Sequence, residues 1–219
     1  GNLKFNAEAT SRCTQMSADD RLLCFLPLFH CFGQNFIMNS AVDTRAALIL
    51  HERFVPNEIL ESVLADRATI FLAVPAVYIR FLAQPDIEKY LQPVRYYFTA
   101  AAPMPVEVAR RWRERFGKII YEGYGLTETS PFASYNHHTE YRDGSVGSAL
   151  DGVEIKVIDD KGDTLAPGEI GEIAIKGPNV MKGYYNRPEE TAEAIRDGWF
   201  LSGDIGKMDK DGYVYLIDR

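Results

Sequence analysis

The sequence has few cysteines and no long apolar run. Its 219 residues include 3 cysteines, Cys13, Cys24 and Cys31, with no Cys-x-x-Cys pair among them. An odd number of isolated thiols argues against a disulfide framework or a zinc site and favours a reducing compartment, the cytoplasm. The longest apolar stretch, residues 22–32, contains Pro27 and is well short of the ~20 residues that span a bilayer. No transmembrane segment is expected.

The sequence also lacks an excess of positive charge. Lys and Arg number 24 against 31 Asp and Glu, which gives a formal net charge of −7. No long-range positive field would therefore gather nucleic acid or an anionic membrane, so neither is an expected partner. Any binding of phosphate must be local. The chain opens without a basic leader and apolar run, so no secretory signal is expected.

Residues 21–121 alternate between short apolar runs typical of β-strands and segments with helical spacing of apolar residues. Such alternation predicts an α/β fold, a mostly parallel sheet flanked by helices. The expected strands are residues 22–26, 69–74, 94–99 and 118–121. Between them, helices are expected around residues 59–64 and 108–116.

After about residue 145 the pattern changes to alternating strands separated by Gly/Asp turns. Strands are expected at residues 153–158 and 169–176, with a hairpin at 209–216. We therefore expect two subdomains, an α/β part over residues 1–145 and a small β-rich part over residues 146–219.

The segment at residues 121–131 follows directly on an expected strand, where ligands bind in open parallel sheets. It supplies an aromatic ring, hydroxyls, a carboxylate and glycines that allow close backbone approach, and a nucleotide could use all of them. The alternative is a plain strand-to-helix loop, in which Thr127 or Ser130 caps a helix and Tyr124 packs. No GxxxxGK[ST] motif occurs, and Gly123-Tyr124-Gly125 lacks the third glycine of GxGxxG, which disfavours kinase-like and dehydrogenase classes.

The same segment, Tyr-Gly-Leu-Thr-Glu at residues 124–128, resembles the core motif of the adenylate-forming (AMP-binding) superfamily. Six further motifs of that superfamily follow the expected order, and six in order make a chance match very improbable. They are Pro-Leu-Phe-His-Cys-Phe-Gly at 27–33, Ala-Ala-Ala-Pro at 100–103, Gly-Glu-Ile-Gly-Glu at 168–172, Gly-Tyr-Tyr-Asn-Arg-Pro-Glu at 183–189, Trp-Phe-Leu-Ser-Gly-Asp at 199–204 and Asp-Arg at 218–219. The chain most resembles fatty acyl-CoA synthetases, over the central part of their large N-terminal domain.

The resemblance implies roles for individual residues. It places ATP on seven of them, with the Tyr124 ring on adenine, the Asp204 carboxylate on the ribose hydroxyls and the Thr127 hydroxyl on phosphate. Glu128 is implied as the magnesium ligand, which suits a hard cation that takes a carboxylate together with nucleotide phosphates. The implied nucleotide-binding residues are Ala101, Ala102, Tyr124, Gly125, Thr127, Asp204 and Arg219.

For catalysis the resemblance implies His30, Thr127 and Glu128, with His30 beside the reacting carboxylate. From sequence alone the default interpretations are a satisfied core or packing histidine for His30, a turn residue for Asp204 and a solvated surface residue for Arg219. His137 and His138 receive no role. The implied substrate-binding residues are His30, Phe32, Gly33, Ala100 and Gly123.

The implied reaction is ATP-dependent activation of a carboxylic acid to an acyl-adenylate, followed by thioester formation with CoA. ATP, Mg²⁺ and CoA are the implied cofactors and cosubstrates, and a fatty acid is the favoured substrate. One alternative is an adenylation domain that loads an acyl carrier protein. Another is a non-catalytic nucleotide-binding or interaction module, which would have no need of a metal carboxylate.

The same resemblance implies that the family's Gly/Ser/Thr-rich phosphate loop would precede Gly1 and that a small domain with the catalytic lysine would follow Arg219. On that expectation, the 219-residue chain alone binds nucleotide weakly and does not turn over.

Overall fold

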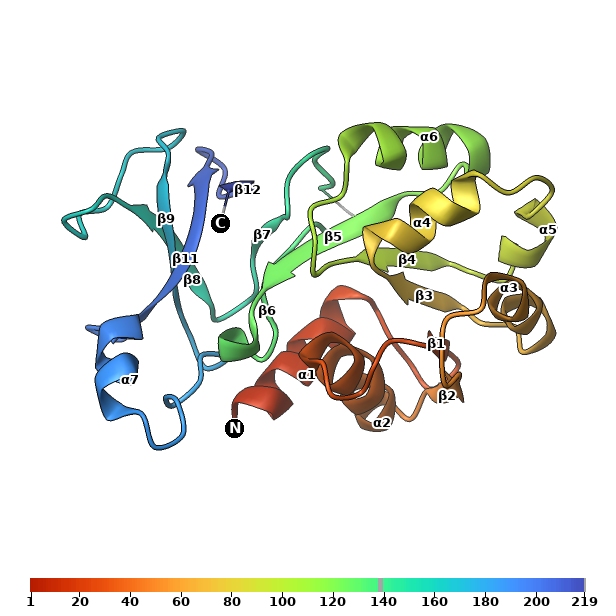
Figure 1. The fold of residues 1–219 in the computed structure, drawn as a ribbon, viewed down its shortest axis with the longest axis horizontal. Coiled ribbons are helices and arrows are strands. Elements are labelled where there is room, and N and C mark those ends of the chain that lie inside the picture. Colours follow the sequence, from red (N-terminus) through yellow and green to blue (C-terminus); the bar gives the residue numbers. More distant parts are fainter. Residues whose placement is uncertain (138–139, 219) are drawn as a thin grey trace. The chain divides into compact units, whose positions relative to one another are not determined.

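The computed structural model describes residues 1–137 and 140–218, and their contacts divide the chain into two compact units (Figure 1). The α/β unit is Ala7–Glu122; the β-rich unit combines Gly1–Asn6 with Gly123–Arg219. The sequence boundary after residue 145 differs from this division. The reason is that residues before 145 pair with later ones: strand β6 (Phe132–Tyr135) pairs with β7 (Ser148–Ala149), and the Leu150 N–H bonds to the Ala133 carbonyl at 2.9 Å. The prediction that a domain boundary follows residue 145 stays a prediction.

The α/β unit is built on a parallel sheet in the order β2-β1-β3-β4-β5. Its strands are β1 (Arg21–Cys24), β2 (Ala47–Leu50), β3 (Ile70–Ala73), β4 (Tyr96–Thr99) and β5 (Ile120–Gly125). The helices are α1 (Asn2–Cys13), which begins in the other unit, η1 (a π-helix, Phe32–Asn39), α2 (Ser40–Thr44), α3 (Pro56–Ala65), α4 (Pro75–Leu82), α5 (Glu88–Leu91) and α6 (Val106–Phe116). The mixed α/β prediction is confirmed. The edge strand β2 was not predicted.

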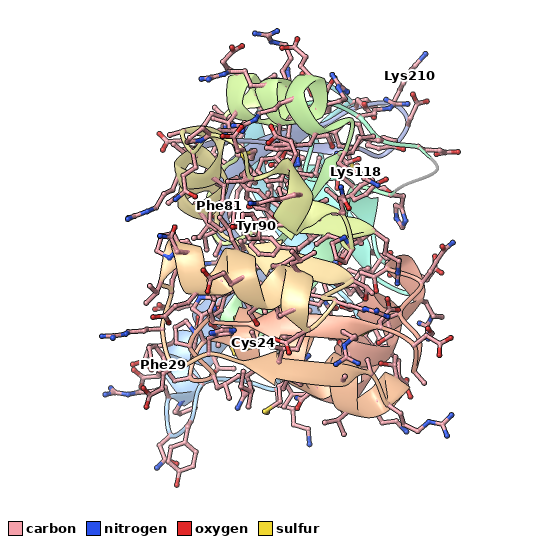
Figure 2. All side chains as sticks on the ribbon, turned by 90° about the vertical axis from the view of Figure 1, so that its right-hand side faces the viewer. Cys24, Phe29, Phe81, Tyr90, Lys118 and Lys210 are labelled. Carbon is pink, nitrogen blue, oxygen red and sulfur yellow. The ribbon has the colours of Figure 1, made fainter. Side chains whose placement is uncertain are left out.

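Helices cover both faces of this sheet because neighbouring strand residues point to opposite sides. Tyr97 faces α6, where its ring lies 5.4 Å from that of Trp112. The next residue, Phe98, faces η1, with its ring 4.9 Å from that of Phe36. A hydrophobic core that includes Phe81 (labelled in Figure 2) lies on the side of α3, α4 and α6. With both faces buried, the strands read as continuous apolar runs.

A buried carboxylate ties together the amino ends of three strands. Asp20, just before β1, accepts hydrogen bonds from Arg95 Nε and Nη2 at 2.8 and 2.7 Å and from Thr69 Oγ1 at 2.7 Å. Thr69 precedes β3 and Arg95 precedes β4. Burial by itself would raise the pKa of Asp20, but the hydrogen bonds from Arg95, Thr69 and the Ser17 N–H lower it below its usual range. Asp20 is therefore ionised when the protein is folded at neutral pH.

We expect Asp20→Asn to destabilise the protein at neutral pH by about 1–3 kcal/mol, because hydrogen bonds to a charged group are lost. The pKa of Asp20 in the folded protein lies below its value of about 3.9 in the unfolded chain. The stabilisation that Asp20 contributes is therefore complete above pH ~3.9 and is lost as the pH falls through the folded-state pKa. Urea unfolding at pH 7 and in steps below pH 4 measures this. The gap between wild type and variant should close in acid, whereas exposed Asp19→Asn should show little effect. An equal gap at every pH would contradict the assignment.

The β-rich unit carries an antiparallel sheet in the order β10-β11-β9-β8, with β12 paired to β11 (Figure 1). The end of β5 pairs in antiparallel fashion with β6, and β6 with β7. The elements are η2 (a 3-10 turn, Thr127–Thr129), β6 (Phe132–Tyr135), β7 (Ser148–Ala149), β8 (Glu154–Ile158), β9 (Gly171–Lys176), α7 (Pro188–Ala194), β10 (Ile195–Arg196), β11 (Trp199–Met208) and β12 (Val214–Asp218). The expected strands and final hairpin are present.

Two turns of this unit have the same construction. Asp159 Oδ1 accepts the N–H groups of Lys161 and Asp163, and Asp209 Oδ1 accepts those of Asp211 and Tyr213. In both turns the fourth residue is a glycine with positive φ, which suits the left-handed conformation.

No helix among the described residues combines the length and apolar character that a membrane crossing needs.

Candidate functional site

In the α/β unit, His30 lies in the turn between β1 and η1 and is exposed. Its Nδ1 accepts the Phe32 N–H at 3.1 Å, so Nε2 carries the proton when the ring is neutral. The preceding residue, Phe29, is 93% exposed and is labelled at the margin of Figure 2. The interpretation of His30 as a core histidine is therefore wrong: the turn that follows Pro27 carries the imidazole to the surface.

The two residues predicted beside His30 have clear packing reasons for their identity. Phe32 is buried, and its ring lies 5.6 Å from that of Phe36. Gly33 is buried, and a Cβ there would come within 2.6 Å of the Pro27 carbonyl oxygen. Only glycine therefore lets η1 begin so close to the His30 turn. Of the two, Phe32 also contacts the imidazole directly, through its N–H.

The predicted Ala100, Ala101 and Ala102 follow directly on β4. Ala100 is buried, whereas Ala101 and Ala102 are exposed, and Ala101 has a φ of 70°, in the left-handed region. Because β1 and β4 are parallel strands of one sheet, the His30 turn and this loop leave the sheet at the same edge. That edge, at the carboxyl ends of the strands, is where open α/β sheets bind ligands.

In the β-rich unit, the structure brings together two of the predicted nucleotide-binding residues. Tyr124, on β5, donates its hydroxyl to Asp204 Oδ2, on β11, at 2.7 Å, and both residues are buried. They are 80 residues apart in sequence. Burial of Tyr124 fits the packing alternative as well as a binding role, but its hydroxyl orients the carboxylate predicted to read ribose.

The loop after Tyr124 is held by backbone constraints. Gly123 is buried, and a Cβ on Gly125 would overlap the Pro131 carbonyl. The 3-10 turn η2 follows, and the hydroxyl of Thr129 closes it by accepting the Leu126 N–H at 2.9 Å. Ser130 ends the turn as its C-terminal cap residue, with its N–H on the Thr127 carbonyl at 3.2 Å, so the capping alternative for Thr127 or Ser130 stays open. Thr127 is exposed at the start of the turn.

Glu128, in the same turn, is partly exposed and contacts a residue that the sequence analysis left without a role. Its Oε1 accepts the hydroxyl of Tyr184 at 2.8 Å, and its main-chain oxygen accepts the Met181 N–H at 2.7 Å. Desolvation and then the hydrogen bond with Glu128 raise the pKa of Tyr184. Tyr184 belongs to the 183–189 motif, which was the signal that could have identified it.

Glu128 fits a magnesium ion that arrives with a nucleotide. Within the described ranges, no group of three or more His, Cys, Asp or Glu side chains could hold a metal ion alone. Mg²⁺ commonly binds through one or two carboxylates, substrate phosphates and waters, so a single accessible carboxylate suffices. Glu128 with the neighbouring Thr127 hydroxyl is the donor set that matches.

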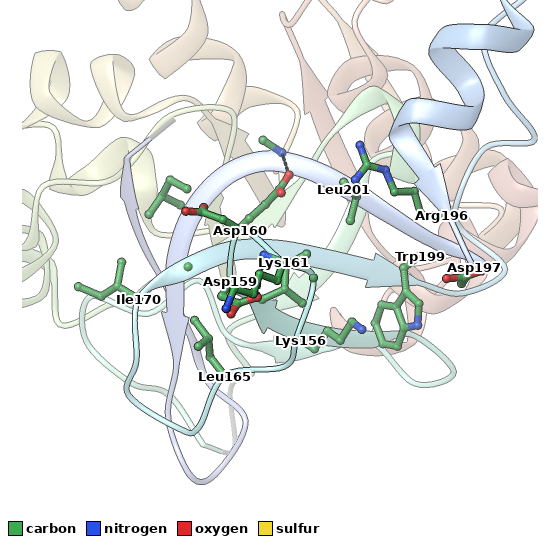
Figure 3. A pocket seen from close by; sticks show the side chains of 16 residues that line it. Lys156, Asp159, Asp160, Lys161, Leu165, Ile170, Arg196, Asp197, Trp199 and Leu201 are labelled. Atoms are coloured by element: carbon green, nitrogen blue, oxygen red, sulfur yellow. Dashed lines mark hydrogen bonds between the residues drawn. The ribbon is translucent and has the colours of Figure 1, made fainter.

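A separate hollow of about 880 Å³ lies over β8, β9 and β11 (Figure 3). Its lining includes Trp199, and Lys156 lies beside that ring with Nζ 4.4 Å from the centroid. Charges of both signs surround it, including Arg196 and Asp197. The lining contains none of the predicted site residues.

Arg219, also predicted to bind nucleotide, lies outside the described residues, as does His138.

The chain belongs to the AMP-binding enzyme family, whose sequence profile matches residues 1–185. It is 36% identical over 222 residues to a feruloyl-CoA synthase of Amycolatopsis, covering 100% of this chain and 45% of that protein. It is also 36% identical over 203 residues to a long-chain-fatty-acid–CoA ligase of Bacillus subtilis, covering 91% of this chain and 36% of that protein. The chain thus spans less than half of these relatives.

The fold agrees with that assignment. The structure of ATP-bound MatB from Rhodopseudomonas palustris matches with a TM-score of 0.95 and 36% identity, covering 100% of this chain and 44% of that one. The predicted resemblance to adenylate-forming enzymes is confirmed by both kinds of comparison. The individual roles of the site residues stay predictions.

Proposed function

We propose that the protein containing this chain is an AMP-forming acid–CoA ligase. The observation that carries the proposal is the buried pair of Tyr124 and Asp204, held at 2.7 Å beside the turn that presents Thr127 and Glu128. The aromatic ring, the hydroxyl and the metal-binding carboxylate lie within residues 124–128, and the hydrogen bond brings the Asp204 carboxylate to them from 80 residues further along the chain. The names of the relatives, both CoA-thioester-forming enzymes, support the same class.

The reaction would take place in two steps. A carboxylate oxygen of the acid attacks the α-phosphorus of ATP, and the bond to pyrophosphate breaks, which leaves an acyl-adenylate. The thiol of CoA then attacks the acyl carbon, and AMP leaves as the thioester forms. Catalysis of the first step is mostly positioning and neutralisation of charge.

The residues of the β-rich unit would hold the nucleotide. Asp204 would accept hydrogen bonds from the ribose hydroxyls, with its orientation fixed by the Tyr124 hydroxyl. Thr127, exposed at the start of η2, would donate to a phosphate oxygen. Glu128 would hold Mg²⁺, which, when bound, neutralises charge on the phosphates. Gly125 would allow the backbone to approach the nucleotide, and Arg219 would contact ribose, whereas Gly123 would allow the backbone to approach the acid.

The residues of the α/β unit would contact the acid. His30 and Ala100 follow strands that end at the carboxyl edge of the sheet, which supports this role, while the neighbouring Ala101 and Ala102 would line the adenine base. Phe32 and Gly33 would shape that edge. The apolar motif at residues 27–33 favours a fatty or aryl acid, and the relatives act on both by name. Among these, we propose a fatty acid. No disulfide joins Cys13, Cys24 or Cys31 among the described residues, which fits an enzyme of the cytoplasm.

The test is carboxylate-dependent exchange of labelled pyrophosphate into ATP by the full-length protein, with fatty, hydroxycinnamic and amino acids offered separately. We expect exchange with a fatty acid, and formation of its thioester once CoA is added. If exchange occurs but no CoA thioester forms, and the acyl group is instead transferred to a phosphopantetheine carrier, then the carrier and not CoA is the acceptor. No exchange with any acid by the folded protein would overturn the proposed function.

A further inference from the structure

The Glu128 residue is held at both its main chain and its side chain by one loop of the β-rich unit. The Met181 N–H bonds to its main-chain oxygen at 2.7 Å, and the Tyr184 hydroxyl bonds to its Oε1 at 2.8 Å. The two contacts come from residues three positions apart, and they meet Glu128 from 53 and 56 positions further along the chain. The contact is therefore one of tertiary structure and not of sequence proximity.

The Tyr184 residue is itself fixed to helix α7 (Figure 1). Its N–H donates to Thr191 Oγ1 at 2.9 Å, and the Thr191 hydroxyl donates to the Arg187 carbonyl at 2.6 Å. The preceding Gly183 has a φ of 149°, and a Cβ there would come within 2.6 Å of Thr191 Cγ2. The Tyr184 ring thus starts from a defined backbone position, although the residue is 38% exposed.

A phenol hydroxyl is a suitable donor to a carboxylate that must bind a cation. An ionised carboxylate has about four lone-pair sites, and a hydroxyl occupies one of them without adding positive charge. A lysine or arginine in the same place would neutralise the carboxylate and compete with a metal ion. Hydrogen bonds of this kind to metal ligands typically contribute 10–100-fold to metal affinity or activity.

From these contacts we propose that Tyr184 is a positioning residue that holds the Glu128 carboxylate in the rotamer that meets magnesium. The inference rests on the proposed function, since it takes Glu128 as the metal ligand. Tyr184 acts through Glu128 and needs no contact with the substrate. Loss of its hydroxyl should weaken metal binding while leaving the fold and the affinity for metal-free nucleotide unchanged.

The chain offers a matched control in the neighbouring Tyr185, which is 90% exposed. Both Tyr184→Phe and Tyr185→Phe remove one hydroxyl from the same loop. In the full-length protein, Mn²⁺ binding in the presence of a non-hydrolysable ATP analogue, followed by electron paramagnetic resonance, reports on the metal without turnover. The Mg²⁺ dependence of pyrophosphate exchange and the affinity for the metal-free analogue complete the set.

We expect Tyr184→Phe to raise the metal concentration at half-saturation by about 10-fold or more in both metal assays. Tyr185→Phe should match wild type, and metal-free analogue should bind all three proteins equally. If Glu128→Gln weakens Mn²⁺ binding but Tyr184→Phe does not, the positioning role is overturned and the proposed function stands. If the wild-type protein shows no metal-dependent binding, the proposed function falls and the role of Tyr184 with it.

Discussion

Replacement of Glu128 by Gln should reduce carboxylate-dependent pyrophosphate exchange by on the order of 10²-fold or more. The substitution keeps the size of the side chain and its ability to accept the Tyr184 hydroxyl at 2.8 Å, but it removes the negative charge. A metal ion bound through an amide oxygen loses the Coulombic attraction that a carboxylate supplies. The developing charge on pyrophosphate would then be poorly neutralised.

The measurement is the exchange rate of the full-length variant over a range of Mg²⁺ concentrations. Glu154→Gln, which changes an exposed carboxylate on β8, serves as the control and should retain wild-type activity. High Mg²⁺ should restore only part of the lost rate, because the ion would be held by phosphates alone. Full activity of Glu128→Gln at low Mg²⁺ would show that the carboxylate does not bind the metal.

The second large effect is expected at Trp112, which is completely buried between helix α6 and the sheet of the α/β unit. Its ring contacts those of Tyr78 and Phe116, with centroids 5.1 and 4.4 Å away. Trp112→Ala should lower the free energy of unfolding by about 3–5 kcal/mol, through lost burial and the cavity left behind. Urea denaturation followed by circular dichroism measures the loss.

Trp112→Phe makes the prediction more specific. The indole Nε1 of Trp112 is buried and has no hydrogen-bond acceptor among the described residues. Phenylalanine keeps most of the ring contacts and removes this unsatisfied donor, so its cost should be only about 1–2 kcal/mol. Arg111→Ala, which changes an exposed neighbour on the same helix, should lie within about 0.5 kcal/mol of wild type. Equal losses for Phe and Ala would argue that ring packing is not what Trp112 contributes.

The sequence predicted two kinds of element best: helices with one buried stripe and strands buried on both faces of the sheet. Strands β3 and β4 are short apolar runs that sheet burial requires, and α6 repeats Val108, Trp112 and Phe116 on one face. The edge strand β2 was missed because Ala47–Leu50 is only partly buried and is too short to show a period. Strand β6 was also missed, and it is as short as β2.

The candidate site divides in the same way. The Tyr124 to Glu128 motif could be identified because its residues are consecutive, and Asp204 because a second motif ends on it. The bond between Tyr124 and Asp204 could not be predicted, nor could that between Glu128 and Tyr184, because each depends on the pairing of distant elements. The exposure of His30 could not be predicted either. Its apolar neighbours in the sequence indicate burial, but the turn after Pro27 places the imidazole at the surface.

The β-rich unit begins with the first six residues of this chain and is completed by the last ninety-seven. Asn6, which is buried there, donates through Nδ2 to the Phe132 carbonyl at 2.7 Å and accepts the Phe132 N–H. During synthesis on the ribosome, the whole α/β unit emerges before Phe132 does. The amide of Asn6 must therefore stay hydrated while its own neighbours fold, and the two units acquire an order of assembly. The α/β unit can fold once its last strand has emerged, whereas the β-rich unit must wait for β12.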